Sequence, residues 1–441
     1  MNTAARRIQR TYLTLLLGNT LAASFIWGIN TLFLLDAGLS NLEAFAANAF
    51  FTAGMVLFEV PTGVVADTWG RRASYLLGTL TLAATTFVYY LLWVYEGPFW
   101  LWALVSIGLG LGFTFFSGAV EAWLVDALHH AEYDGDLEAV FGRGQMIGGA
   151  AMLGGSVAGG VIAQVSTLGV PFLMRVGVLL VMFGVAWRLM FDLGFTPERG
   201  ASPVGAVRKV FVTSLDHGLK NPPVRWIMLA APFTSGVGFY TFYALQPYLL
   251  ELWGDSEAYA VAGLAAAIVA GSQIAGGYLA PRIRALFHRR TTPLILGTLV
   301  SSGILVLLGV TNAFWVALGL LVAWGLIFAA EMPIRQAYLN GMIPSQQRAT
   351  VLSFDSLMGS SGGVVVQPVL GKSADVWSYA ASYVIGAAFQ VLAVPFLLLS
   401  RRENSPSDAM VGSPEPVREP SPVEVPCPPD AAATVSGSRA G

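Results

Sequence analysis

The stretch "EVPTGVVADTWGRR", residues 59–72, follows a long apolar run and contains four charged side chains, two of each sign. They are Glu59, Asp67, Arg71 and Arg72, and a proline and two glycines stand between them. Charge is scarce elsewhere, because only 11% of the 441 residues are charged and 55% are hydrophobic. Soluble domains average about 25% charged residues. The stretch therefore marks a place where the chain leaves an apolar environment.

Several segments are apolar over the length of about 20 residues that a helix needs to cross a bilayer. Residues 101–120 and 292–310 are two of them. The sequence thus predicts an all-helical protein that crosses the lipid bilayer several times. The first ten residues lead into an apolar segment without a small-residue cleavage site, which favours a first spanning helix over a cleaved signal. A net charge of −2 argues against a nucleic-acid partner, which would favour a basic face.

Apolar windows predict twelve transmembrane helices in two pseudo-symmetric six-helix bundles. The expected spans are 13–35, 41–66, 73–95, 99–128, 139–165, 170–191, 224–250, 258–281, 292–310, 313–338, 349–371 and 377–400. Lys and Arg accumulate in cytoplasmic loops. Here they gather before the first span and after the second, sixth, eighth and twelfth, and Lys372 is the only basic residue of the opposite loops. Both termini are therefore predicted to be cytoplasmic.

The predicted organisation has five parts. They are a cytoplasmic N-terminus (1–12), a first bundle (13–191), a cytoplasmic linker (192–223), a second bundle (224–402) and a tail (403–441). Apolar residues at helical spacing in the linker predict an amphipathic helix on the inner membrane surface. The tail is rich in Pro, Ser and acidic residues, which predicts disorder. An offset of 210 residues sets Glu121 on Glu331 with matching Ala and Leu neighbours, as expected if six helices were duplicated.

Residues 63–72 read G-V-V-A-D-T-W-G-R-R and match G-x-x-x-D-x-x-G-R-[KR] at every fixed position. That signature lies between helices 2 and 3 of the major facilitator superfamily, which the chain resembles over residues 1 to about 402. "EVPTG", "SGAVEAWLVD" and "FYALQPYL" look like the bacterial drug-exporter-like members. Helix 5 matches a glycine-rich antiporter motif only in part, since Ala151 replaces a glycine and Ser156 the proline.

The resemblance implies a secondary transporter that works by alternating access. In that family the signature aspartate, here Asp67, meets the N-terminus of helix 11, where the helix dipole favours an anion, and helps to hold the outward-facing state. Ser345 is the candidate N-cap of that helix.

The candidate residues for conformational control carry physical roles of their own. Gly63 lies one turn before Asp67, where it would let a neighbouring helix approach closely. Gly70 permits a tight turn. Asp126 is expected to pack toward Arg71 or Arg72. The full set is Gly63, Asp67, Gly70, Arg71, Arg72 and Asp126.

Ionisable side chains inside the predicted helices each cost about 2.5–3.5 kcal/mol on insertion scales, so each needs a partner or a water-filled cavity. Glu331 and Arg335 are one turn apart and are expected to pair. Glu121 has no basic residue within a turn of its own helix, so it is predicted to be the better proton carrier. Fixed ion pairs throughout remain the alternative. The proton-coupling candidates are Glu121, Glu331, Asp355 and Glu59, and the ion-pair candidates are Arg143 and Arg335. Arg175 is a further ionisable residue inside a predicted helix.

Polar and aromatic residues of helices 1, 7 and 8 are candidates to line a substrate cavity, because they offer stacking and hydrogen bonds to an amphipathic ligand. They are Asn30, Tyr240, Tyr243, Gln246 and Gln273. "GSSGG" (359–363) lies in a predicted membrane helix without a preceding strand, so it does not indicate a hydrolase. The four His residues have no metal-ligand spacing. We expect no enzyme activity, no cofactor and no metal.

The sequence-based hypothesis is a monomeric secondary transporter of the inner or plasma membrane, which exports a small amphipathic molecule in exchange for protons. Two alternatives stay open. One is a uniporter or importer of a small metabolite with the same fold. The other is a non-transporting membrane sensor or scaffold, which the long tail suggests.

Overall fold

The computed structural model describes residues 3–116, 118–197, 205, 208, 212, 218–343 and 348–409. Within these ranges the chain is helical and forms no β-strand, only an isolated bridge between Arg289 and Ala409. The predicted linker helix lies almost wholly outside the described residues. The candidate cap Ser345 also lies outside them.

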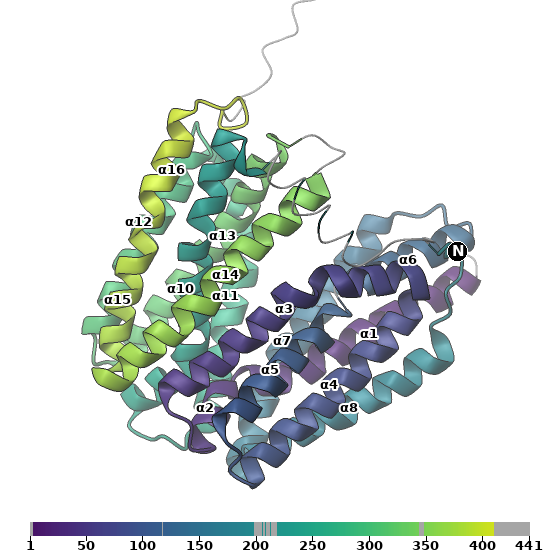
Figure 1. Cartoon of the computed structure of the whole chain (residues 1–441), viewed down its shortest axis with the longest axis horizontal. Coiled ribbons are helices and arrows are strands. Elements are labelled where there is room, and N and C mark those ends of the chain that lie inside the picture. Colours follow the sequence, from purple (N-terminus) through teal and green to yellow (C-terminus); the bar gives the residue numbers. More distant parts are fainter. Residues whose placement is uncertain are drawn as a thin grey trace, which may run out of the picture.

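The helices form two groups that follow one another in the chain and lie on opposite sides of the molecule (Figure 1). The first group consists of α1 (Thr3–Trp27), α2 (Asn30–Asp36), α3 (Asn41–Trp69), α4 (Arg71–Val94), α5 (Phe99–Thr114), α6 (Ala119–His130), α7 (Leu137–Val165) and α8 (Gly169–Leu189). The second group consists of α10 (Pro222–Trp253), α11 (Tyr259–Ala285), α12 (Thr291–Val310), α13 (Phe314–Asn340), α14 (Arg348–Val376), α15 (Tyr379–Val391) and α16 (Ala393–Arg402).

Nine helices of the described chain are long and apolar enough to cross a membrane, or ten if α1 and α2, bent by 47°, form one span. α10 and α14 are not among the nine. α14 carries Asp355, Lys372 and Asp375 along its length, which lowers its mean hydropathy. α14 packs against α10 of its own group and against α3 of the first group, which accounts for its more polar composition.

The first predicted span begins earlier and is interrupted. α1 already starts at Thr3, and a break after Trp27 separates it from α2. A side chain on Gly28 would lie 2.9 Å from Gly263 of α11, so the break occurs where two backbones meet. The fourth span is also interrupted, at Gly118, whose φ of +69° a residue with a side chain rarely adopts. Small residues also bring α7 against α1, where a Cβ on Gly159 would lie 1.9 Å from the carbonyl oxygen of Phe25.

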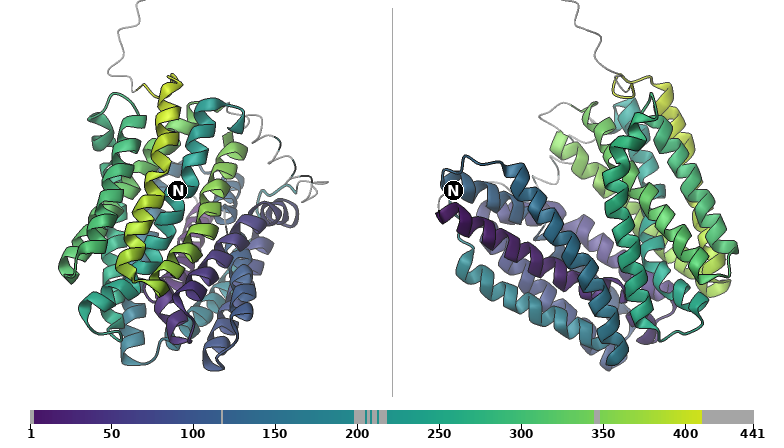
Figure 2. Two further views of the ribbon diagram at one scale, coloured as in Figure 1. Left: turned by 60° about the vertical axis from the view of Figure 1, so that its left-hand side comes forward. Right: turned by 180° about the vertical axis from the view of Figure 1, so that it is seen from behind.

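The two ends of the molecule differ. Thr3 and the end of α16 lie at one end, which we call the terminal end; the opposite end is the far end. The two groups of helices meet at the far end and diverge toward the terminal end (Figures 1 and 2).

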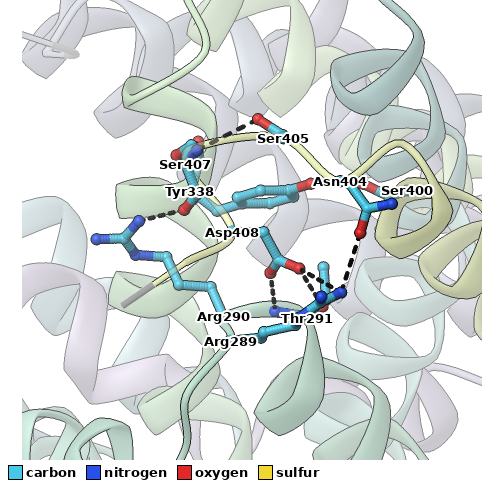
Figure 3. Close-up of polar contacts among 9 residues, drawn as sticks. All are labelled: Arg289, Arg290, Thr291, Tyr338, Ser400, Asn404, Ser405, Ser407 and Asp408. Carbon is cyan, nitrogen blue, oxygen red and sulfur yellow. Dashed lines mark hydrogen bonds and ion pairs between the residues drawn. The ribbon is translucent and has the colours of Figure 1, made fainter. Parts of the chain in front are cut away.

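The described chain continues past α16 and folds back on the second group, so disorder predicted from residue 403 begins too early. Asp408 is only 2% exposed, and its carboxylate accepts hydrogen bonds from the backbone N–H (2.8 Å) and hydroxyl (3.0 Å) of Thr291 (Figure 3). The Ser407 hydroxyl donates to the carbonyl of Tyr338 at 2.8 Å. Residues 403–409 therefore belong to the folded second group, while residues 410–441 lie outside the described chain.

Candidate functional site

The break between α1 and α2 is bound by a side chain of the other group. The Gln246 side chain is fully buried; its Oε1 accepts from the Thr31 N–H at 2.9 Å and its Nε2 donates to the Trp27 carbonyl at 2.7 Å. A helix end leaves such backbone groups without partners. The Thr31 hydroxyl also donates to the Tyr243 carbonyl at 3.0 Å. Gln246, predicted to line the substrate cavity, instead joins the two groups at the far end.

An aspartate on α14 caps the first turn of α3 across the same interface. The Asp375 carboxylate accepts from the backbone N–H groups of Asn41 (2.9 Å) and Leu42 (2.8 Å). The free N–H groups and dipole of a helix N-terminus favour an anion there. The Tyr379 hydroxyl donates to the Asn41 side chain beside it. We call these contacts, together with those of Gln246, the far-end seal.

Sequence reasoning missed Asp375. The available signal was an acidic residue near the outer end of helix 11, on the same predicted side of the membrane as the start of helix 2. Several outer loops carry acids, however, and only the tertiary structure shows which one meets a free helix terminus.

Other hydrogen bonds between the groups also lie in the far half. The Gln164 Oε1 accepts from the Ala260 N–H at 3.3 Å, and the Gln367 Nε2 lies 3.5 Å from the Thr52 hydroxyl. At the terminal end, the ion pair Asp67–Arg71 lies within the first group, and the pair Arg289–Asp408 lies within the second.

At the terminal end, the signature residues contact their own group. Asp67 pairs with Arg71 at 2.6 Å, one turn away. The Arg72 N–H donates to the Asp192 carboxylate at 2.9 Å, and its guanidinium lies over the Trp187 ring, 5.0 Å from the centroid. Burial raises the pKa of the Asp192 carboxyl, against the lowering effect of the Arg72 N–H.

Two expectations for this region are wrong in the described conformation. Arg71 forms an ion pair with Asp67, and the guanidinium of Arg72 lies over Trp187 and Phe191 near the end of α8. Neither arginine forms an ion pair with Asp126 of α6 among the described residues. No described residue of another helix lies within 4 Å of a Cβ placed on Gly63, so the expected close approach is not seen there. Residues 344–347, which precede α14 and include the expected contact of Asp67, lie outside the described residues.

The charges of the second group pair differently from the prediction. Arg335 donates two hydrogen bonds to Asp355 of α14, at 2.5 and 2.6 Å, and does not pair with Glu331. The Glu331 Oε1 is buried without a hydrogen-bond partner among the described residues. It occupies the space that Gly297 of α12 leaves open, since a Cβ there would lie 1.7 Å from it. Sequence spacing allowed the Glu331–Arg335 pair, but Asp355 of α14 lies within reach of the same guanidinium and binds it instead.

The remaining charged candidates lie in more open places. Glu121 is exposed in the first turn of α6 and interacts electrostatically with Tyr12. Arg143 is exposed on α7 and forms no ion pair in the described part of the chain. Glu59 is half-buried on α3 and has an interaction partner.

The other cavity candidates differ in their surroundings. Tyr240 is buried and shares a hydrogen bond of 2.5 Å with Ser382, within the second group. Asn30 donates to the Asn48 side chain at 3.0 Å. Tyr243 and Gln273 are half-buried. No cluster of three potential metal ligands occurs among the residues that the structure describes.

Apolar helices of spanning length and a fold of two helical groups define a multi-pass membrane protein, and the family comparison gives its class. Residues 12–367 match the model of the Major Facilitator Superfamily, so the chain belongs to this superfamily. It is a transporter rather than an enzyme. No curated protein matches the sequence closely enough to be a relative.

Solved transporter structures share the fold at low identity. The nucleoside transporter NupG matches with a TM-score of 0.73 and 11% identity, covering 91% of this chain and 100% of that chain. A bacterial homolog of the human lysosomal transporter Spinster, inward-facing and unoccupied, gives 0.71 and 15%, covering 93% and 100%. A D-xylose-proton symporter gives 0.62 and 18%, covering 89% and 96%. These structures do not single out the drug-exporter-like members, and that resemblance rests on sequence alone.

Proposed function

We propose that this protein is a secondary active transporter that exports a small amphipathic molecule in exchange for protons by alternating access. The proposal includes twelve membrane crossings in two six-helix bundles, with bent pairs such as α1 and α2 counted as one crossing each. It also places both termini in the cytoplasm, and a monomer in the plasma membrane.

The far-end seal is the observation that carries this proposal. Alternating access requires that the substrate site open to one side of the membrane at a time. Contacts of Asp375 and Gln246 join the two groups at one end, while the signature residues at the other end pair within their own group. With the terminal end in the cytoplasm, this arrangement supports an inward-facing state. The likeness to an inward-facing Spinster homolog is consistent with it.

Glu331 is the best-supported proton carrier, rather than Glu121. Its Oε1 is buried without a partner, whereas Arg335, one turn away, is bonded to Asp355 of α14. Intramembrane acids without a fixed partner mark proton and substrate pathways. The neighbouring position on α12 is Gly297, which brings no charge to the carboxyl.

A reversible lock on the far-end seal tests alternating access. In a Cys427→Ser background, Phe45→Cys with Gly371→Cys places two thiols between α3 and α14 beside the seal, because a Cβ on Gly371 would lie 2.9 Å from the Phe45 Cβ, within reach of a disulfide. We expect oxidation to stop the flux of dyes from a panel of fluorescent amphipathic cations and anions in proteoliposomes with an imposed pH gradient, and reduction to restore it. Each single-cysteine variant is the control. Equal flux from oxidised and reduced protein would contradict alternating access.

The same flux assay tests the proton carrier. Glu331→Gln should lose the response to the pH gradient, and Glu121→Gln should keep it.

A further inference from the structure

Arg175 is a cation buried in the far half of the first group. It lies six residues into α8, about 9 Å along the helix at 1.5 Å per residue. The residue is only 7% exposed, and Phe172 and Leu179 on the same helix are buried beside it. A basic side chain at such a position is costly, so it pairs with another group or faces a functional site.

Among the described residues, no acidic side chain compensates this charge. The Arg175 Nε is buried and has no hydrogen-bond partner among the described residues. The groups that interact with it electrostatically are the hydroxyls of Tyr243 and Tyr89, and no carboxylate of the described chain is among them. Arg335 shows the usual solution, because its guanidinium is bonded twice to Asp355. Arg175 thus lacks the structural partner that explains most buried arginines.

The three groups come from three helices and from both sides of the molecule. Tyr89 lies on α4, Arg175 on α8 and Tyr243 on α10 of the second group. Tyr243 is also part of the contacts at the far-end seal, where its carbonyl accepts from Thr31. A ligand held by these groups would bridge the two halves beneath the seal.

Both tyrosines pack against further aromatic rings. The Tyr89 ring packs edge-on against Trp102, with centroids 4.8 Å apart. The Tyr243 ring lies 5.4 Å from Phe242, also edge-on. An arginine fork matches a planar carboxylate with two parallel hydrogen bonds. One positive charge balances one negative charge, which fits a carboxylate better than a doubly charged phosphate.

We propose that Arg175, with Tyr89 and Tyr243, binds the carboxylate of an amphipathic organic anion whose apolar body lies among the neighbouring aromatic rings. This inference names the substrate class for the transport proposed above and rests on that function. The anion supplies the missing counter-charge, and its contacts with Tyr243 couple binding to the position of the second group.

Equilibrium binding to the purified full-length protein in detergent tests this assignment without any gradient. The probes are 2-naphthoate, its neutral analogue 2-naphthamide and 2-naphthyl phosphate, each followed by thermal shift and tryptophan fluorescence. We expect 2-naphthoate to bind the wild type at least tenfold more tightly than either of the other two. Arg175→Gln should abolish that preference, and Arg175→Lys should retain part of it because the charge remains without the fork. Arg188→Gln, in the last turn of the same helix, is the matched control and should bind as the wild type does.

Tyr243→Phe gives a second measurement that does not depend on the folding of the arginine variants. Loss of its hydroxyl should weaken 2-naphthoate binding several-fold and leave the affinity for 2-naphthamide unchanged. Equal affinity of wild type and Arg175→Gln for 2-naphthoate overturns the site. A wild type that binds neither anion more tightly than the neutral 2-naphthamide also overturns it. Tighter binding of the phosphate than of the carboxylate overturns the ligand class. Binding as expected in a protein that shows no flux would leave this site standing and refute the transport proposal.

Discussion

α4 and α12 both begin with backbone N–H groups that need a hydrogen-bond acceptor, and the aspartate that caps α12 is more deeply buried than the one that caps α4. Each helix begins at the terminal end with free N–H groups, and each receives an aspartate from the segment that follows the last helix of its own group. Asp192 accepts a hydrogen bond from the backbone N–H of Arg72 and stays half-buried. Asp408 accepts from both the backbone N–H and the hydroxyl of Thr291 and is 2% exposed.

The strength of the two caps does not follow the sequence signature. The loop before α4 carries the complete signature, whereas "GGYLAPRIR" (276–284), ahead of α12, retains only a trace of it. Nevertheless the cap at α12 is the more buried, and Arg290 adds a hydrogen bond from its backbone to the Asp408 carbonyl at 2.9 Å. The difference indicates that the signature is not needed to anchor a helix start.

The largest effect is expected from Gly70→Ala. Gly70 has a φ of +106° and a ψ of 154°, a region that is nearly exclusive to glycine, and a Cβ would lie 2.3 Å from the Asp192 carboxylate. Strain of about 1–3 kcal/mol and a lost cap of about 1 kcal/mol predict a destabilisation of about 3 kcal/mol. Thermal unfolding in detergent measures it. Gly63→Ala, in the same signature but in open space, is the control and should change stability by less than about 0.5 kcal/mol. Similar losses from both would show that the strain argument is wrong.

Asp408→Ala should have the next largest effect, because it leaves the buried N–H and hydroxyl of Thr291 without an acceptor. Hydrogen bonds to a charged group contribute about 1.5–3 kcal/mol, so we expect a loss of about 2 kcal/mol. Asp408→Asn keeps one acceptor and should lose about half as much. The same unfolding measurement checks both variants. If deleting residues 403–441 costs nothing, the folded-back segment does not anchor α12.

Asp192→Asn should have the smallest effect, below about 1 kcal/mol, since this cap is half-exposed. Burial raises the pKa of the Asp192 carboxyl. A carboxyl with a raised pKa in the folded state favours folding below its unfolded pKa, and that contribution is lost as the pH rises through the folded value. The stability of Asp192→Asn relative to wild type should therefore increase with pH across that interval. Unfolding curves recorded from pH 4 to pH 8 measure this change, with Asp408→Asn for comparison. A difference in stability between Asp192→Asn and wild type that stays constant over this range would refute the prediction.

Most helix ends could be predicted from sequence because hydrophobic length is a local property. The start of α12 was expected at residue 292 and lies at Thr291, and α7 ends at Val165 as expected. The break after Trp27 could not be predicted, because it depends on the approach of Gly28 to Gly263 and on a side-chain amide, Gln246, more than 200 residues away.

The sequence by itself determined that the protein lies in a lipid bilayer, through its low charge and its apolar segments of spanning length. It also indicated the family, through the signature at residues 63–72. Which charges pair was decided only by the tertiary structure. Spacing along one helix placed Glu331 within reach of Arg335, but electrostatic partners in a medium of low dielectric are selected by what packs across from them. Asp355 on α14 therefore binds Arg335, Asp192 caps the start of α4, and Arg175 lies beneath the far-end seal with no acidic partner in the described part of the chain.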